Sequence, residues 1–167
     1  MSRLLALIAA ATTAACASSG ATPQPFPTGR PAAPVVPAPE APSAVGGGYA
    51  VAGTALSLRG SPYRNGGSDP TGFDCSGFVA YVFGQHGYAV PRSVGELFRR
   101  GQEVAADAIQ PRDLVFFDTA GHGVSHVGIV VGGDQFVHAP STNGVVRIDR
   151  VSGTYWAARF VGARRVS

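Results

Sequence analysis

The chain has 167 residues, a formal net charge of +3 and 14% charged residues, a proportion too low for a coiled coil or a polyelectrolyte tail. All 13 basic residues are arginines, and their scattered positions argue against a nucleic-acid partner. The two cysteines are too few for a disulfide framework. A chain of this length can hold one folded domain with additional segments.

Residues 1–17 have the pattern of an export signal. An arginine precedes an apolar run that is too short to span a bilayer, and small residues follow it. Two alanines stand directly before Cys16, as at the processing site of a bacterial lipoprotein, so we expect Cys16 to carry a lipid. In the alternative, Cys16 lies within an ordinary small-x-small cleavage site and leaves with the signal.

Residues 18–48 predict a disordered tether. Eight of the 13 prolines lie there, among small residues and with almost no large apolar side chains. Such a segment cannot bury enough surface to offset the entropy lost on ordering. Signal, lipid and tether together predict an exported lipoprotein that faces the periplasm, anchored at the outer rather than the inner membrane.

Residues 49–167 predict a folded domain in which helices precede strands. Helical patterns cover residues 50–58, 74–83 and 94–100, and short apolar or β-branched runs cover 113–118, 126–131, 135–139, 145–149 and 158–166. A loop rich in turn residues separates the first two helices. This order predicts an α+β fold, with N-terminal helices packed on a mostly antiparallel sheet of about five or six strands.

Cys75 stands at the start of the second predicted helix. Backbone N–H groups and the helix dipole favour a thiolate there, which predicts a lowered pKa and a nucleophilic role. Asp74 is expected to cap this helix, although its charge would oppose ionisation of the thiol. The alternative is a buried, inert cysteine.

His126 and His138 belong to two strands that form a predicted hairpin with its turn near residues 132–134. Counting outward from the turn places the two imidazoles opposite each other. A thiolate, a base and a group that orients the base would complete a nucleophilic site. A Cys-His-His zinc site is the alternative. Tyr63 is a candidate for placing a hydroxyl beside the sulfur.

Seven motifs resemble, in order, those of the NlpC-type cell-wall peptidases over residues 50–166. They are Gly60-Ser-Pro-Tyr-Arg-Asn-Gly-Gly67, Gly72-Phe-Asp-Cys-Ser-Gly-Phe-Val79, Pro91-Arg92-Ser93, Asp113-Leu-Val-Phe-Phe117, Ser125-His-Val-Gly-Ile-Val130, Phe136-Val-His-Ala-Pro140 and the segment from Tyr155-Trp156 to Val166. The resemblance implies a papain-like fold, no cofactor and no metal, and hydrolysis of amide bonds in peptidoglycan stem peptides or cross-links by a monomer.

By the same resemblance, Cys75 is the nucleophile, His126 the general base and His138 the orienting residue. Tyr63 would contribute to the oxyanion hole, and the residues flanking the cysteine, Asp74 and Ser76, would line the same region.

The sequence departs from the family pattern at Arg112, where glycine is usual, and at Leu97, where glutamine is frequent. Two other functions remain open. One is a non-catalytic wall-binding module, and the other is an acyltransferase or amidase on the same fold.

Overall fold

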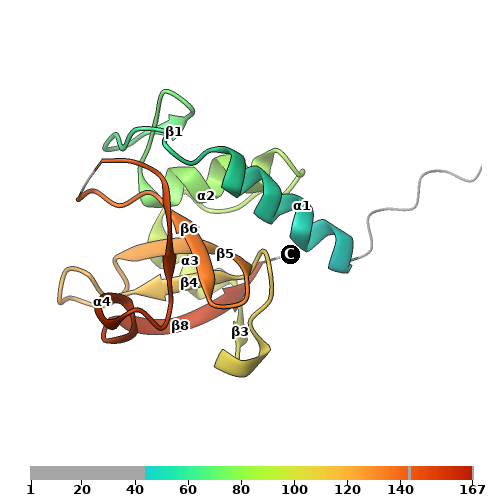
Figure 1. The fold of residues 1–167 in the computed structure, drawn as a ribbon, viewed down its shortest axis with the longest axis vertical. Coiled ribbons are helices and arrows are strands. Elements are labelled where there is room, and N and C mark those ends of the chain that lie inside the picture. Colours follow the sequence, from blue (N-terminus) through green and yellow to red (C-terminus); the bar gives the residue numbers. More distant parts are fainter. Residues whose placement is uncertain (1–43, 143, 167) are drawn as a thin grey trace, which may run out of the picture. The chain divides into compact units, whose positions relative to one another are not determined.

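The structure is a computed structural model that describes residues 44–142 and 144–166 (Figure 1). The predicted export signal with Cys16, and the predicted tether up to residue 43, lie outside the described residues. Within the described part, no helix is both long and apolar enough to cross a bilayer.

Four α-helices and one short 3-10 helix are present in the described ranges. They are α1 (Ala44–Ser57), α2 (Cys75–Gly84), α3 (Val94–Arg100), α4 (Thr154–Ala157) and the 3-10 turn Ala106–Ala108. The predicted helices at 74–83 and 94–100 are confirmed. In α2, the apolar residues Phe78, Val79, Val82 and Phe83 are fully buried, as their spacing on one helical face requires.

The first helix begins at Ala44, inside the segment expected to be a tether, rather than at Ala50. Close packing explains the early start. The backbone of Gly48 lies very near Pro111, a residue of the turn before residue 114. A Cβ at this glycine would be 2.8 Å from the Pro111 carbonyl oxygen. Gly48, which by composition indicated flexibility, therefore allows a close backbone approach.

A six-stranded, fully antiparallel sheet forms the centre of the domain and confirms the α+β prediction. Its strand order is β3-β8-β4-β5-β6-β7. The strands are β3 (Gln102–Val104), β4 (Leu114–Phe117), β5 (His126–Gly132), β6 (Gln135–His138), β7 (Arg147–Arg150) and β8 (Phe160–Arg165), and a separate hairpin joins β1 (Ser68–Asp69) and β2 (Gly72–Phe73). The sequence showed no clear pattern for β1, β2, β3 and α4.

Each face of the sheet carries its own apolar cluster. Helices α1 and α2 lie on one side of the sheet (Figure 1). The cluster on that face, which we call the helix-side cluster, contains Leu114, Phe116 and Ile129. On the other face, Phe117 and Phe136 pack with Trp156 of α4. Alternation along β4 and β5 sends successive side chains to opposite clusters.

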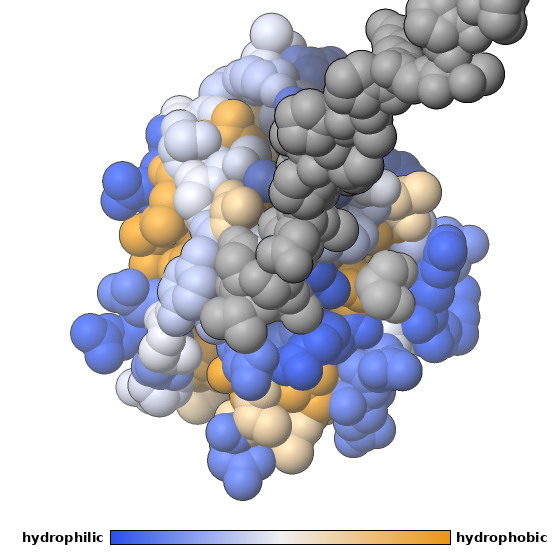
Figure 2. Space-filling model, turned by 90° about the vertical axis from the view of Figure 1, so that its right-hand side faces the viewer, coloured by the Kyte–Doolittle hydropathy of each residue, from blue (hydrophilic) through white to orange (hydrophobic). Residues whose placement is uncertain are grey.

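Large apolar side chains that remain exposed come from separate elements: Tyr49, Val145, Tyr155 and Val161. Figure 2 shows a face on which apolar patches are interrupted by hydrophilic residues. The expectation of a monomer stays a prediction.

The register of the β5–β6 hairpin differs from the predicted one. Ile129 lies opposite Val137, and an irregularity near the turn shifts the pairing. Continued along the strands, this register puts His138 level with Gly128, two residues from His126. The direct pairing predicted for the two histidines is therefore wrong, but their side chains are diagonal neighbours on one face, within reach of each other.

Arg112 explains one departure from the family pattern. It has a φ of 84°, a backbone conformation that favours glycine. Its guanidinium donates to the Tyr88 hydroxyl at 2.9 Å and to the Val166 carbonyl at 2.7 Å, and it lies over the Tyr88 ring. These contacts offset the conformational cost of a side chain at this position.

We predict that Gly128→Ala lowers the free energy of unfolding by about 1–3 kcal/mol. A Cβ at Gly128 would be 2.4 Å from Cδ2 of Phe136, which is buried and cannot move away freely. Urea denaturation measures the change. Gly53→Ala in α1 is the matched control, because a Cβ there meets nothing within 4 Å, and it should stabilise slightly. Equal stability of Gly128→Ala and the wild type would contradict this packing.

Candidate active site

Cys75 is the first residue of α2, and Asp74 caps that helix. The Asp74 carboxylate accepts a hydrogen bond of 2.7 Å from the backbone N–H of Gly77. The cysteine side chain is half-buried against the helix-side cluster. The backbone N–H groups of Ser76 and of Val127 in β5 lie close enough to the sulfur to favour its ionised form. The thiol therefore sits where the start of α2 meets the start of β5.

The pKa of the Cys75 thiol is nevertheless raised, contrary to the lowered value predicted from the helix start. Burial is the main cause, and the neighbouring Asp74 charge adds to it. The N–H groups act in the opposite direction but do not outweigh burial. The Cys75 side chain is therefore a neutral thiol at neutral pH.

Arg92 forms an ion pair with Asp74, which partly neutralises the charge of this carboxylate. Its two terminal nitrogens each donate to the Asp74 carboxylate at 2.7 Å, one of them also donates to the Ser76 hydroxyl at 2.8 Å, and the other donates to the Gly67 carbonyl at 3.0 Å. Burial would raise the pKa of Asp74, but the bonds from Arg92 and Gly77 lower it, so this carboxylate stays ionised. The pair places a compensated negative charge beside the sulfur.

A chain of hydrogen bonds connects the two histidines to Asp149. His126 Nε2 lies 2.8 Å from His138 Nδ1, and His138 Nε2 lies 2.9 Å from Asp149 Oδ2. The same Asp149 oxygen also accepts from Trp156 Nε1 at 2.9 Å and from Arg147 Nε and Nη2 at 3.0 and 2.8 Å. The two imidazoles are thus adjacent, as predicted, although their strand positions are not directly opposite, and Asp149 extends the pair.

This chain of hydrogen bonds determines which nitrogen of each ring carries the proton. Asp149 can only accept, so a neutral His138 carries its proton on Nε2 and leaves Nδ1 as an acceptor. His126 must then donate through Nε2, which leaves the lone pair of His126 Nδ1 free. That nitrogen is the one ring position of the pair able to take a proton from another group.

Burial keeps both imidazoles neutral. It lowers the pKa of His126 to about 3, helped by the nearby charges of His138 and Arg147. It lowers the pKa of His138 to about 4, although the bond to Asp149 acts in the opposite direction. Hydrogen bonds from His138, Trp156 and Arg147 lower the pKa of Asp149 against the effect of its own burial. At neutral pH both imidazoles are therefore uncharged, and the Asp149 carboxylate that accepts from His138 is ionised.

No hydrogen bond joins the Cys75 thiol to an imidazole among the described residues. Cys75 packs with the helix-side cluster, whereas His126 stacks on Trp156, with ring centroids 5.4 Å apart, on the other side of the sheet. Contact between α2 and β5 brings the two groups to the same end of β5. Apo sites often close such a bond only when substrate binds.

Tyr63 lies near enough to Cys75 for the two groups to interact electrostatically, and its predicted role in the oxyanion hole stays a prediction. Its loop is held by a bond from the Phe73 N–H to the Pro62 carbonyl at 3.0 Å. Burial raises the pKa of the Tyr63 hydroxyl, and the nearby Cys75 and Asp74 charges raise it further. The hydroxyl therefore stays protonated and can donate a hydrogen bond.

The side chains of Asp74 and Ser76 are bound to Arg92 rather than left open to a ligand. In this arrangement, it is the backbone N–H of Ser76, not its hydroxyl, that lies near the sulfur. Their predicted role beside the oxyanion hole stays a prediction.

The zinc alternative does not fit the two imidazoles. Three of their four ring nitrogens are already paired with each other or with Asp149. In residues 44–142 and 144–166, no group of three or more His, Cys, Asp or Glu side chains could hold a metal ion.

A pocket of about 440 Å³ adjoins this relay. Its walls include His126, Trp156, Tyr155 and Arg147. A substrate can therefore reach the imidazole from outside.

Comparison with known proteins places the chain in a family. Residues 60–165 match the model of the NlpC/P60 family. The chain belongs to this family. The resemblance drawn from the seven motifs is thereby confirmed, and so is the predicted papain-like α+β fold.

Relatives of known name share this domain. The chain is 44% identical over 109 residues to "Murein DD-endopeptidase MepS/Murein LD-carboxypeptidase" of Escherichia coli K12, a match covering 65% of this chain and 57% of that protein. It is 46% identical over 107 residues to "Probable endopeptidase p60" of Listeria seeligeri, covering 64% of this chain but only 20% of that protein. The chain thus spans a fifth to little more than half of these relatives.

Solved structures of NlpC/P60 proteins have the same fold as this chain. An NlpC/P60 family protein from Bacillus cereus superposes with a TM-score of 0.67 at 32% identity, covering 71% of this chain and 39% of that one. The NlpC/p60 domain of the peptidoglycan hydrolase SagA gives a TM-score of 0.62 at 34% identity, covering 71% of this chain and 98% of that one.

We predict that Arg92→Gln raises the pKa of the Cys75 thiol further, because the Asp74 charge beside it loses its partner. Alkylation of the thiol by iodoacetamide at pH 7.5 should slow on the order of two- to tenfold, and its pH profile should move to higher pH.

The double variant Asp74→Asn/Arg92→Gln removes both charges and should return the profile towards that of the wild type. Arg100→Gln, at the exposed end of α3, is the matched control and should change nothing. A profile of Arg92→Gln that overlays the wild type would show that the ion pair does not act on the thiol.

Proposed function

We propose that this protein is an exported cysteine peptidase that hydrolyses amide bonds of peptidoglycan stem peptides or cross-links. The hydrogen-bonded relay His126–His138–Asp149, on a strand whose backbone at Val127 lies near the Cys75 thiol, is the observation that supports the proposal. Family membership and the murein endopeptidases among the relatives support the substrate class.

The first step transfers the thiol proton of Cys75 to Nδ1 of His126 while the sulfur attacks the carbonyl carbon of the substrate. Because thiol and imidazole both start neutral, this transfer accompanies attack instead of preceding it. The new positive charge on His126 is stabilised through His138 by the ionised Asp149.

The tetrahedral oxyanion needs donors in a site from which water is largely excluded. The protonated Tyr63 hydroxyl and the backbone N–H at the start of α2 are the candidates. His126 then protonates the leaving nitrogen, the C–N bond breaks, and a thioester to Cys75 remains. A water molecule, deprotonated by His126, attacks the thioester and releases a carboxylic acid and the thiol.

Digestion of purified murein tests the proposal. The wild type should release soluble muropeptides with new amino groups, and Cys75→Ala should release none. In the same assay, His126→Ala should be slower by 10²–10⁴-fold, because it loses general acid–base catalysis. His138→Asn should keep measurable turnover, since an amide can replace part of its hydrogen bonding.

Urea denaturation of each variant shows whether it folds. Muropeptide release by Cys75→Ala at the wild-type rate would exclude the thiol mechanism. An equal loss in folded His138→Asn and His126→Ala would contradict the roles assigned to the two histidines. Binding of murein without hydrolysis, or transfer of the acyl group to an amine, would favour the two alternative functions.

We also propose that Cys16 anchors the protein to a membrane and that residues 18–43 tether the domain to it. The sequence alone supports this part: the apolar run, the small residues before Cys16 and the proline-rich segment. A tether of this kind would let the domain reach the wall on the order of tens of ångströms from its lipid.

We predict that the wild type expressed in a Gram-negative host partitions into detergent and incorporates a labelled fatty acid, whereas Cys16→Ala does neither. The unchanged murein activity of purified Cys16→Ala serves as control. A mature wild-type chain that starts after Cys16 and stays in the aqueous phase would show that ordinary cleavage occurs.

A further inference from the structure

The pocket beside His126 has an uneven distribution of charge. Aromatic rings of Tyr155 and Trp156 and the hydroxyls of Thr119 and Ser141 line it, together with the guanidinium of Arg147. Among its described lining residues there is no carboxylate. A small anionic group is therefore the kind of ligand that this pocket favours.

The Arg147 guanidinium is held in place by Asp149, but not all of its N–H groups have a hydrogen-bond partner among the described residues. Its Nε and Nη2 atoms donate to Asp149 Oδ2, which fixes the guanidinium plane. Its Nη1 has no hydrogen-bond partner among the described residues, and the side chain is 36% exposed. A guanidinium oriented in this way can bind a carboxylate with little loss of side-chain entropy.

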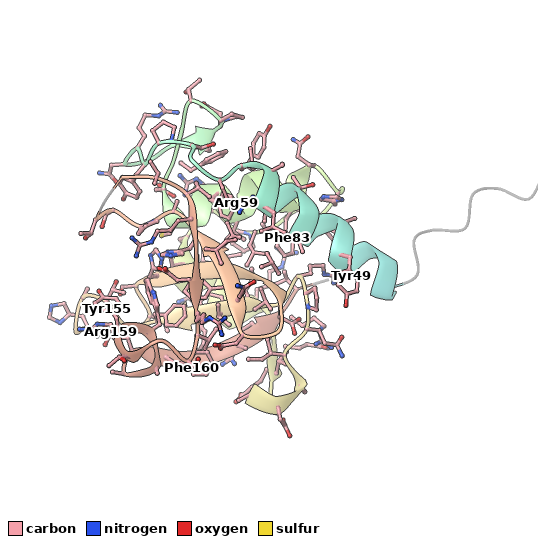
Figure 3. The ribbon with its side chains drawn as sticks, in the orientation of Figure 1. Tyr49, Arg59, Phe83, Tyr155, Arg159 and Phe160 are labelled. Atoms are coloured by element: carbon pink, nitrogen blue, oxygen red, sulfur yellow. The ribbon has the colours of Figure 1, made fainter. Side chains whose placement is uncertain are left out.

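The aromatic side of the pocket is also fixed. The guanidinium of Arg159 lies 3.9 Å from the centre of the Tyr155 ring and donates to the Tyr155 carbonyl. Figure 3 shows Tyr155 and Arg159 together at the α4 end of the domain. Arg159 thus packs on Tyr155, and Arg147 is the one arginine among the described residues that line the pocket.

The mechanism decides which part of a substrate enters. His126 has to protonate the leaving nitrogen, so that nitrogen must lie against the ring of His126. Because this ring forms a wall of the pocket, the residue that bears the released amine occupies the pocket, whereas the acyl part lies towards Cys75 and Tyr63.

We propose that Arg147 binds a free carboxylate on the residue whose amino group is released. The substrate class is thus an amide whose nitrogen belongs to an amino acid with an unblocked α-carboxylate next to that nitrogen. This inference rests on the proposed function and specifies its substrate. An amide whose neighbouring carboxyl group is itself in a peptide bond, or is amidated, would lose the contact with Arg147.

The test begins with the murein digest, in which mass spectrometry identifies the residue that bears the new amine. Two synthetic peptides then present this bond with either a carboxylate or a carboxamide on that residue. The wild type should prefer the carboxylate by about tenfold or more in kcat/KM. In Arg147→Gln the ratio should fall close to one, and Arg147→Lys should keep part of it.

The ratio separates recognition from the relay. Arg147→Gln also weakens the hold on Asp149, which slows both peptides alike and cancels in the ratio. Arg150→Gln, an exposed arginine on the same strand, is the matched control and should keep the wild-type ratio.

A new amine on a residue without a neighbouring free carboxylate would overturn the inference. So would a wild-type ratio near one, or a ratio that Arg147→Gln leaves unchanged. Failure of folded wild type to cleave murein or either peptide would instead overturn the proposed function, and this inference with it.

Discussion

One carboxylate oxygen organises the histidine pair of the candidate site. Asp149 Oδ2 accepts hydrogen bonds from His138, Trp156 and Arg147, which come from two strands and a short helix. A buried neutral imidazole has two tautomers, and only a fixed acceptor at one end decides between them. Through His138 this oxygen orients a ring that it never contacts.

The two groups that we propose to react come from opposite sides of the sheet. Cys75 belongs to the helix-covered side, and His126 belongs to the side of Trp156. Cys75 and His126 can cooperate only at the N-terminal end of β5, where the backbone N–H of Val127 lies near the sulfur. A shift of β5 would move His126, the proposed base, away from Cys75, the proposed nucleophile. Gly128 helps to fix the position of β5, because the lack of a side chain lets the strand lie close to Phe136.

The sequence was sufficient where local patterns decide structure. The buried face of α2, the bounds of α3 and the five longer strands follow from the spacing of apolar residues. Helix α1 was predicted too short, because the packing of Gly48 against Pro111 is a long-range contact that composition does not report. The histidine pair was found although its register was wrong, since a diagonal neighbour is still within reach.

The remaining parts of the site depend on contacts between distant segments. Arg92 stands in a recognised motif, but nothing local indicates that it binds Asp74. Asp149 had a weak signal, because alternation along β7 places it on the face of Arg147, the residue opposite His138. The raised pKa of Cys75 was missed, since a helix start predicts the dipole effect but not the degree of burial.

The protonated state of the thiol has a consequence for the lifetime of the protein. A thiolate attacks peroxides and disulfides, so the rate at which a cysteine is oxidised follows its ionised fraction. A cysteine that is ionised at rest is open to irreversible oxidation between turnovers. Here burial raises the pKa of the Cys75 thiol, so in the mechanism that we propose the feature that delays attack on the substrate also slows oxidation of the sulfur.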